Sequence, residues 1–166
     1  MKKVLVLYFS KTGNTKEMAE LVKEGAEQVK DTTVKILSIE EAKPEDLLWA
    51  DGVAMGAPTW EGIIPWQAKK WWDEAVPKAW GKVKGKIGCA FSSQGGWGGG
   101  AELTCMSILT IMINFGMLVF GVNDYTGDKT TLHYGSISAG RPDKEELKES
   151  CRMLGRRLAE TVQLMK

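Results

Sequence analysis

The sequence predicts a single α/β domain over residues 1–166, built in three layers from a parallel sheet with helices on both faces. Two observations carry this prediction. Short apolar runs that are typical of strands alternate with segments of helical spacing, which is the pattern of a doubly wound parallel sheet. The length fits one domain, and the 43% hydrophobic and 26% charged residues are ordinary globular values that exclude wholesale disorder.

Five segments are expected to form the strands of this sheet. Residues 2–9 contain the compact apolar run VLVLYF followed by a polar, glycine-containing segment, which indicates a central strand that ends in a loop. Residues 33–38 alternate polar and apolar side chains around Val34 and Ile36. The other three strands are expected at residues 52–56, 87–92 and 117–122.

Helices are expected at residues 15–29, 65–75 and 101–115, and at the end of the chain. The last helix has the clearest signal, because Asp143 and Glu146 have the spacing of a capping box at its start. The helix then carries an apolar stripe of Leu147, Cys151, Leu154, Leu158 and Val162.

An uncharged stretch from Cys105 to Val122 is long enough to be considered as a membrane span. Asn114 and Gly116 interrupt it, and glycine commonly ends a helix, so a buried helix followed by a buried strand is expected instead. The helix at 101–115 is more apolar than one face of a sheet requires. Part of it, with nearby tryptophans, is therefore expected to bury surface in a homodimer.

The charge and the cysteines restrict which partners and which cellular compartment are expected for the protein. The 22 Lys and Arg against 21 Asp and Glu give a net charge of +1, which argues against a bulk electrostatic binder of nucleic acid. The three cysteines lack metal-binding spacing and are expected to be buried and reduced, and no signal peptide is evident, so a cytoplasmic protein without a metal is expected. Four lysines are either a solvated face or a docking surface for an acidic redox protein such as a ferredoxin: Lys78, Lys82, Lys84 and Lys86.

The first of three unusual loops, residues 10–15 with the sequence SKTGNT, follows the first strand. Hydroxyl side chains, a glycine and the start of a helix converge there, and this combination suits a phosphate group. The alternative is that these side chains only cap the helix, for which one of them would suffice. The GxxxxGK[ST] pattern of nucleoside triphosphate loops is absent. A phosphate site is therefore predicted.

The second loop, residues 56–62, and the third loop, residues 92–100, follow the third and fourth strands. Trp60 in the second loop and Trp97 in the third offer aromatic faces to a flat ring. The glycines of the third loop allow its backbone to approach a planar ligand closely. Packing in the core or at an interface is expected instead for Trp66, Trp71, Trp72 and Trp80.

These loops resemble those of the flavodoxin family. YFSKTGNT is similar to its FMN phosphate loop, and GAPTWEGIIP is similar to the flavin-flanking loop with its tryptophan. The resemblance covers nearly the whole chain and implies FMN as the cofactor and a five-stranded sheet in the order 2-1-3-4-5. Flavodoxins themselves illustrate the rule that ligands bind at the carboxyl edge of such a sheet, so the placement of the site is not independent of the resemblance.

The resemblance implies three groups of FMN-binding residues and no catalytic residue. The phosphate would contact Ser10, Lys11, Thr12, Gly13, Asn14 and Thr15. One side of the ring would contact Pro58, Thr59, Trp60, Glu61 and Gly62. The other side would contact Ser92, Ser93, Gln94, Gly95, Gly96 and Trp97. His133 either contacts the ring or a substrate or forms only local bonds. Glu61 either lowers the potential of the ring or is a solvated loop charge.

The family leaves two functions open, so whether the chain is an enzyme is undecided. An FMN electron carrier that shuttles low-potential electrons between redox proteins is slightly favoured, because the chain is small and shows no acid–base pair for substrate reduction. The alternative is an FMN-dependent NAD(P)H:quinone oxidoreductase, since SSQGGWGGGAELT resembles the multimeric flavodoxin-like enzymes. Those enzymes usually have His-His-Gly-Met where this chain has Asn-Phe-Gly-Met at residues 114–117. A nucleotide-sensing module without turnover is a third possibility that no residue favours.

Overall fold

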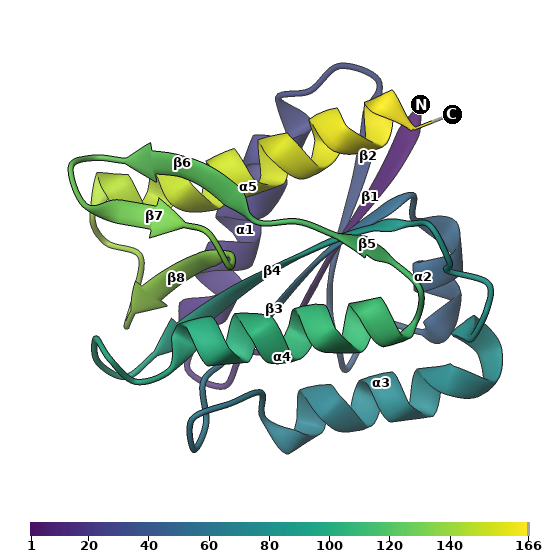
Figure 1. Ribbon diagram of the computed structural model, residues 1–166, viewed down its shortest axis with the longest axis horizontal. Helices are drawn as coiled ribbons and strands as arrows, with labels where there is room; N and C mark the ends of the chain where they lie inside the picture. The colour runs from purple at the N-terminus through teal and green to yellow at the C-terminus, as the bar shows by residue number, and fades with distance from the viewer. Residues whose placement is uncertain (166) are drawn as a thin grey trace.

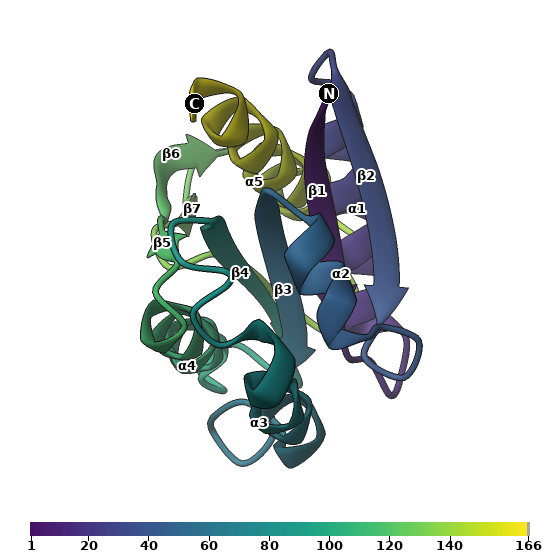
Figure 2. The ribbon, with the colours of Figure 1, turned by 90° about the vertical axis from the view of Figure 1, so that its right-hand side faces the viewer.

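Parallel strands in the order β2-β1-β3-β4-β5 form the central sheet of the computed structural model, which describes residues 1–165. The strands are β1 (Lys2–Tyr8), β2 (Thr32–Ser38), β3 (Gly52–Pro58), β4 (Ile87–Gln94) and β5 (Leu118–Val119). Figures 1 and 2 show helices on both faces of this sheet. The predicted three-layer fold and strand order are therefore confirmed.

Two helices cover one face of the sheet and three cover the other. The first pair is α1 (Asn14–Glu27) and α5 (Glu145–Leu164), and the other three are α2 (Pro44–Trp49), α3 (Trp66–Ala79) and α4 (Ala101–Asn114). Each face has its own core. Trp72 and its neighbours fill the core under α3 and α4, and Phe91 lies in the core under α1 and α5. The short helix α2 was not predicted.

Helices α1 and α5 cross at two glycines. A Cβ atom built on Gly25 would lie 1.9 Å from the carbonyl oxygen of Arg152, and one built on Gly155 would lie 1.8 Å from the carbonyl oxygen of Val22. Only glycine therefore permits this backbone approach. The expected apolar stripe of α5 is buried in the same layer, which confirms the predicted orientation of that helix.

The predicted fifth strand, residues 117–122, is wrong in its extent. Only β5 pairs there, with Ile87 and Gly88 of β4. The chain then leaves the sheet to form the antiparallel hairpin of β6 (Val122–Thr126) and β7 (Thr130–Leu132) and returns as β8 (Ser136–Ala139). β8 pairs in parallel with residues 91–94 of β4. The edge of the sheet is thus shared by two short strands, and the hairpin between them contributes Val122 and Leu132 to the core.

Other boundaries differ from the prediction by small amounts. Helix α5 begins at Glu145, and Lys144 rather than Asp143 is the residue before it. The backbone N–H of Asp143 donates instead to the carbonyl of Arg141 (2.9 Å), which forms a tight turn ahead of the helix. Gly116, with φ of 79°, follows the end of α4 as expected.

The helix at 101–115 is less buried than predicted. One side of α4 packs on the sheet, but Leu103, Met106 and Ile113 are exposed on the other. Of the four tryptophans expected in the core or at an interface, Trp71 and Trp72 are buried, whereas 66% of Trp66 and 53% of Trp80 is exposed to solvent. Within residues 1–165, no helix combines the length and the apolar character that a membrane crossing requires.

Candidate functional site

The first loop presents the amino end of α1 without a side-chain cap. Gly13 occupies the position before the helix with φ of 94°, and no side chain among the described residues caps the helix. The Ser10 hydroxyl instead accepts a hydrogen bond from the N–H of Gly13 (3.1 Å). A Cβ built on Gly13 would meet nothing within 4 Å. The amino end of α1 thus lacks a side-chain cap among the described residues, and the space beside Gly13 is open, which suits an anion better than the capping alternative does.

Thr15 joins the first loop to the third. Its hydroxyl lies 2.8 Å from the hydroxyl of Ser93, and both residues are almost fully buried. Because Thr15 is in the first turn of α1 and Ser93 is near the end of β4, this bond fixes the amino end of the helix against the carboxyl edge of the sheet. The bond therefore sets the position of the proposed anion site relative to the third loop.

The second loop is a tight turn between Trp60 and Ile63, whose backbones exchange two hydrogen bonds of 3.0 and 3.2 Å. Glu61 and Gly62 at its tip have φ of 48° and 89°. Glycine adopts such angles readily, but a glutamate does so at a cost of about 1 kcal/mol or more. The Glu61 side chain is exposed.

The indole of Trp60 is held by two neighbours from the first loop and the end of β1. The ring of Phe9 packs edge-on against it at 5.5 Å between centroids. The ammonium of Lys11 lies 5.7 Å from the centre of the Trp60 ring, within the range of a cation–π contact. The second loop therefore contacts the first loop through the cation–π contact of Lys11 and packs against the end of β1 through Phe9.

Hydrogen bonds tie the second loop to the third. The Thr59 N–H donates to the Ser93 carbonyl (2.7 Å), and the hydroxyls of Thr59 and Ser92 are 3.2 Å apart. Thr104 of α4 donates its hydroxyl to that of Thr59 (2.9 Å). Thr104 was not predicted to belong to the site. The sequence feature that could have pointed to Thr104 is its hydroxyl group on the side of α4 that packs against the sheet.

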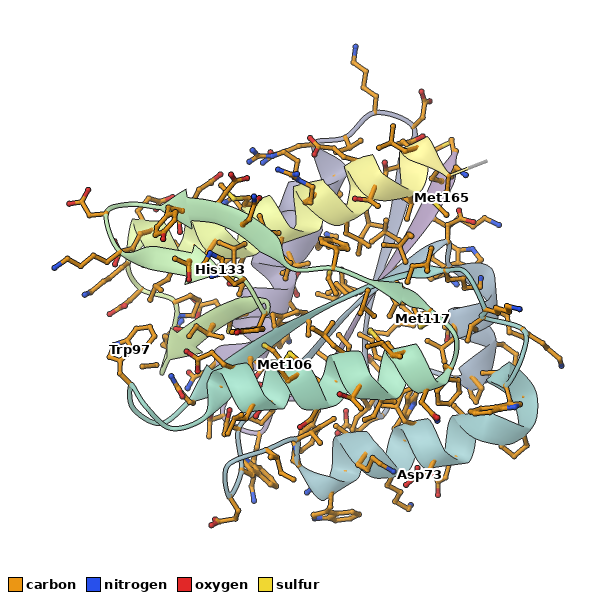
Figure 3. All side chains as sticks on the ribbon, viewed as in Figure 1. Asp73, Trp97, Met106, Met117, His133 and Met165 are labelled. Carbon is orange, nitrogen blue, oxygen red and sulfur yellow. The ribbon has the colours of Figure 1, made fainter. Side chains whose placement is uncertain are left out.

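The third loop starts at buried hydroxyls and ends in an open run of glycines. Ser92, Ser93 and Gln94 are buried, whereas Trp97 is 62% exposed at the tip of the loop (Figure 3). Gly100 precedes α4 with φ of 99°, and a Cβ there would lie 2.9 Å from the carbonyl oxygen of Gly62. The second and third loops thus touch through a glycine contact.

His133 lies outside this group of loops. It precedes β8 by three residues, on the side of the sheet edge away from the ends of β4 and β8, and its ring packs edge-on against Tyr125 of the hairpin at 6.1 Å. Figure 3 shows it at the hairpin, apart from Trp97. The structure therefore supports the local alternative for His133.

The basic stretch, Lys78, Lys82, Lys84 and Lys86, also lies away from the three loops. It connects α3 to the start of β4, at the opposite end of the sheet from the three loops (Figure 1). Lys78 pairs with Glu45, and Lys86 donates to the carbonyls of Leu48 and Ala50. The exposed Lys82 and Lys84 are thus the members of the stretch that a partner would meet, far from the loops.

Known proteins resemble this chain over most of its length. The family model described as Flavodoxin matches residues 6–129. A flavodoxin of Aquifex aeolicus (strain VF5) is 59% identical over 162 residues, which cover 98% of this chain and 88% of the relative. An NAD(P)H dehydrogenase (quinone) of Acidovorax ebreus (strain TPSY) is 32% identical, with 97% and 96% of the two chains covered.

Solved structures with a similar fold also include flavodoxins. A solved flavodoxin from the domain Archaea is 31% identical and superposes with a TM-score of 0.76 over 97% of this chain and 99% of the other. The described loops and the similar sequences thus lead to the same family.

Proposed function

The chain belongs to the flavodoxin family and is an FMN-dependent electron-transfer protein, and from that premise we propose that its three loops hold the FMN. The phosphate is bound by residues 10–15 at the amino end of α1. The isoalloxazine ring is flanked by Trp60 and its neighbours 58–62 on one side and by residues 92–97 on the other. The observation that carries this proposal is the uncapped, open amino end of α1, fixed to the third loop through Thr15 and Ser93.

Bound FMN supplies low-potential electron chemistry, and the protein controls how the ring is held and reached. The N–H groups at the start of α1 and the hydroxyls of Thr12 and Thr15 bind and orient the phosphate. Trp60 and Trp97 cover the ring and limit the access of water. His133 is left out of the binding site, because it contacts the hairpin instead.

Replacing both threonines of the first loop tests the phosphate site. We expect Thr12→Val with Thr15→Val to weaken FMN binding by at least about a hundredfold, since hydrogen bonds to charged groups each contribute about 1.5–3 kcal/mol. Titration of the apoprotein followed by flavin fluorescence measures this. Riboflavin, which lacks the phosphate, is the matched control and should lose far less affinity. The single variant Thr12→Val leaves the bond between Thr15 and Ser93 intact, and equal losses for both ligands in this variant would place the phosphate elsewhere.

The electron carrier is favoured over the quinone oxidoreductase. The flavodoxin relative is 59% identical and the quinone dehydrogenase relative 32%. We propose a redox protein such as a ferredoxin as the electron donor. In an anaerobic cuvette, reduced ferredoxin should bleach the FMN-loaded protein within the mixing time, whereas NADH or NADPH should leave it yellow. Rapid bleaching by a nicotinamide nucleotide would reverse this assignment.

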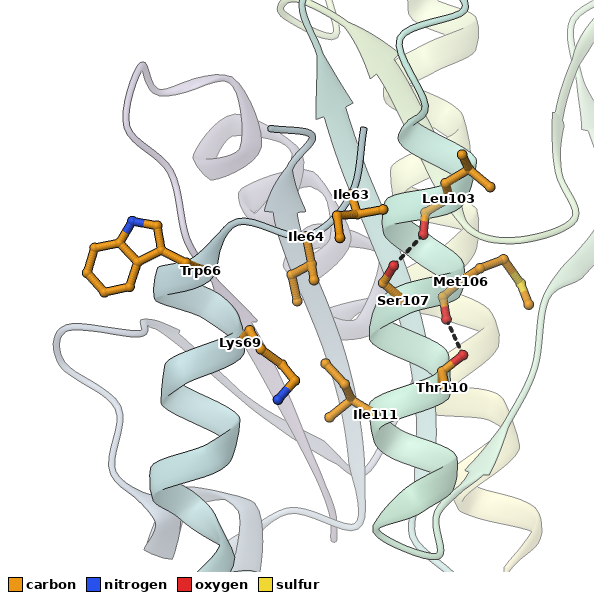
Figure 4. Close-up of a pocket in the computed structure, with 9 residues that line it drawn as sticks. All are labelled: Ile63, Ile64, Trp66, Lys69, Leu103, Met106, Ser107, Thr110 and Ile111. Carbon is orange, nitrogen blue, oxygen red and sulfur yellow. Dashed lines mark hydrogen bonds between the residues drawn. The ribbon is translucent and has the colours of Figure 1, made fainter. Parts of the chain in front are cut away.

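A homodimer is proposed from the outer side of α4. A groove of about 610 Å³ between α3 and α4 is lined mainly by apolar side chains, among them Ile63, Ile64, Leu103, Met106 and Ile111 (Figure 4). The side of α4 that faces outward carries no charge from Leu103 to Asn114, a length of about 18 Å. Uncharged apolar side chains are typical of the buried centre of a homodimer interface, and two copies with net charge +1 repel each other little.

Polar substitution in the groove tests the dimer. We expect the wild-type protein to sediment as a dimer at micromolar concentration, and Leu103→Ser with Met106→Ser to shift it to monomer while FMN binding is retained. Leu164→Ser is the matched control, because this leucine is 84% exposed at the far end of α5. A wild-type monomer at high micromolar concentration would refute the dimer.

A cytoplasmic location is proposed from the cysteines. Cys89, Cys105 and Cys151 are buried free thiols. Free thiols are typical of a reducing compartment. Fractionation of cells that express the tagged full chain tests this: recovery with cytoplasmic markers supports the proposal, and recovery with the periplasm would contradict it.

A further inference from the structure

Gln94 stands where the sheet ends and the third loop begins. It is the last residue of β4, and its side chain is almost fully buried at 4% exposure. Its carbonyl accepts a hydrogen bond from the N–H of Gly140 (2.8 Å), just after β8. The backbone of Gln94 is therefore fixed by β8 on one side, and the pairing of β4 with β3 ends one residue earlier, at Ser93.

The side-chain amide of Gln94 has a defined orientation. Its Oε1 accepts a hydrogen bond from the backbone N–H of Ala101 (2.9 Å), the first residue of α4. Gly100 before this helix has no side chain to cap it, so Gln94 provides the cap. Only the oxygen of an amide can accept this bond, and the position of Nε2 follows from it. One amide thus joins the two ends of the glycine-rich segment 95–100.

The other half of the amide has no partner. Nε2 of Gln94 is buried, and no acceptor among the described residues lies within hydrogen-bonding distance. A buried N–H donor without an acceptor destabilises a protein, so an acceptor from outside the chain, a ligand or an ordered water molecule, is expected. The other buried polar side-chain atoms without a partner lie outside the three loops, on α3, β6 and β8. Ser138 on β8 lies opposite Ser93 of β4 and is the nearest of these to the site. Within the three loops, Gln94 is the one described residue that carries such a group.

We propose that Nε2 of Gln94 donates a hydrogen bond to the isoalloxazine ring of FMN, whose carbonyl oxygens and ring nitrogens are acceptors. This inference rests on the proposed binding of FMN by the three loops. Gln94 is then a positioning residue that sets the ring against the third loop and the start of α4. A donor at the ring also favours its more electron-rich reduced form and raises the reduction potential.

Two substitutions separate this role from capping of α4. Gln94→Glu keeps an oxygen acceptor for the Ala101 N–H and loses the donor, whereas Gln94→Met loses both. We expect Gln94→Glu to lower the thermal stability of the apoprotein, because a carboxylate replaces a buried amide. At a pH where this carboxyl group is ionised, we expect the variant to bind oxidised riboflavin and FMN at least about 3- to 10-fold more weakly, the range of one hydrogen bond. Unchanged affinity in Gln94→Glu would reduce Gln94 to a cap and overturn the proposal.

Gln94→Met tests the effect on the reduction potential of bound FMN without adding a charge. We expect a more negative midpoint potential for its bound FMN than for wild type. Gln67→Met is the matched control, because Gln67 on α3 also has a buried unpartnered amide atom and lies outside the loops. Equal potentials in Gln94→Met and Gln67→Met would contradict the proposal.

Nuclear magnetic resonance of the wild-type protein provides a test that needs no variant to fold. The side-chain N–H resonances of Gln94 should shift downfield when FMN is added, while those of Gln67 stay in place. If FMN binds and the Gln94 resonances do not move, the inference on Gln94 is wrong. If the fluorescence of FMN is not quenched when the protein is added, FMN does not bind and the proposed site itself is wrong. The failure of the Gln94 contact and the failure of the site are thereby distinguished.

Discussion

Single residues in the core respond to pH in a way that the burial of their side chains dictates. Burial raises the pKa of the Cys89 and Cys105 thiols far above their ordinary value, with the carboxylate of Glu102 adding to the effect on Cys105. Burial also raises the pKa of Cys151 to about 11, although hydrogen bonds from Ser136 and Ser150 oppose the shift. The native fold therefore keeps these thiols protonated where the unfolded chain ionises them.

The stability of the fold should fall in alkali for this reason. Below the ordinary thiol pKa of 9.0 the contribution of the protonated thiols is fully present, and it is lost as the pH rises toward the native values. We expect each thiol to lower the unfolding free energy by up to about 1.4 kcal/mol per pH unit above that point. Urea denaturation at pH 8, 9 and 10 measures this. Cys89→Ala should be less stable at each of these pH values but show a shallower slope of unfolding free energy against pH. A slope identical to that of the wild type would show that the Cys89 thiol does not cause the loss.

At the scale of elements, the crossing of α1 and α5 leaves no room for a side chain. We expect Gly25→Ala or Gly155→Ala to destabilise the apoprotein by about 2–4 kcal/mol, because the backbones would have to separate. Thermal denaturation measures the loss. Gly96→Ala is the matched control, since a Cβ there meets nothing within 4 Å. A similar loss in all three variants would show that the crossing is not the cause.

The elements that the sequence predicts well are the long ones with a regular pattern. β1 and β4 are apolar because helices cover both faces of the sheet, and α5 is recognisable because its buried side chains recur at helical spacing. α2 has six residues and the hairpin strands five or fewer, too short for a period to emerge. Their positions follow from tertiary contacts instead, such as the pairing of β8 with β4.

The candidate site was predictable to a similar degree. The loops could be placed because the ends of parallel strands meet at one edge. The bonds within the site could not be placed, since Thr104 and Thr59 are 45 residues apart. Trp66 and Trp72 illustrate the same limit: both are in one helix, and only the neighbouring α4 and the sheet decide which is buried.

The whole molecule has two functionally different ends. The loops lie at the carboxyl ends of the strands, and Lys82 and Lys84 lie at the amino end of β4, a strand of eight residues or about 26 Å. This separation exceeds the screening length of about 8 Å at physiological ionic strength. We therefore expect Lys82→Glu with Lys84→Glu to leave the rate of electron transfer from reduced ferredoxin nearly unchanged, as measured by stopped flow.

The tip of the second loop is the matched site for that experiment. Glu61 is exposed beside the proposed ring, so Glu61→Lys should change the transfer rate and its dependence on salt. Reversing a charge is thus expected to change the transfer rate at the carboxyl ends of the strands and to leave it nearly unchanged at their amino ends. A larger effect from the lysine pair than from Glu61 would place the docking surface at the amino ends of the strands.

The divided sheet edge beside β4 has a consequence for the behaviour of the protein at high concentration. A long, straight border strand exposes a row of backbone groups on which another chain can grow as amyloid or as an aggregate. Here the border consists of β5 with two residues and β8 with four, and the chain bends away between them. No extended template is therefore offered on this side. The detour through the hairpin protects the molecule against joining its neighbours sheet to sheet, whatever else the hairpin contacts.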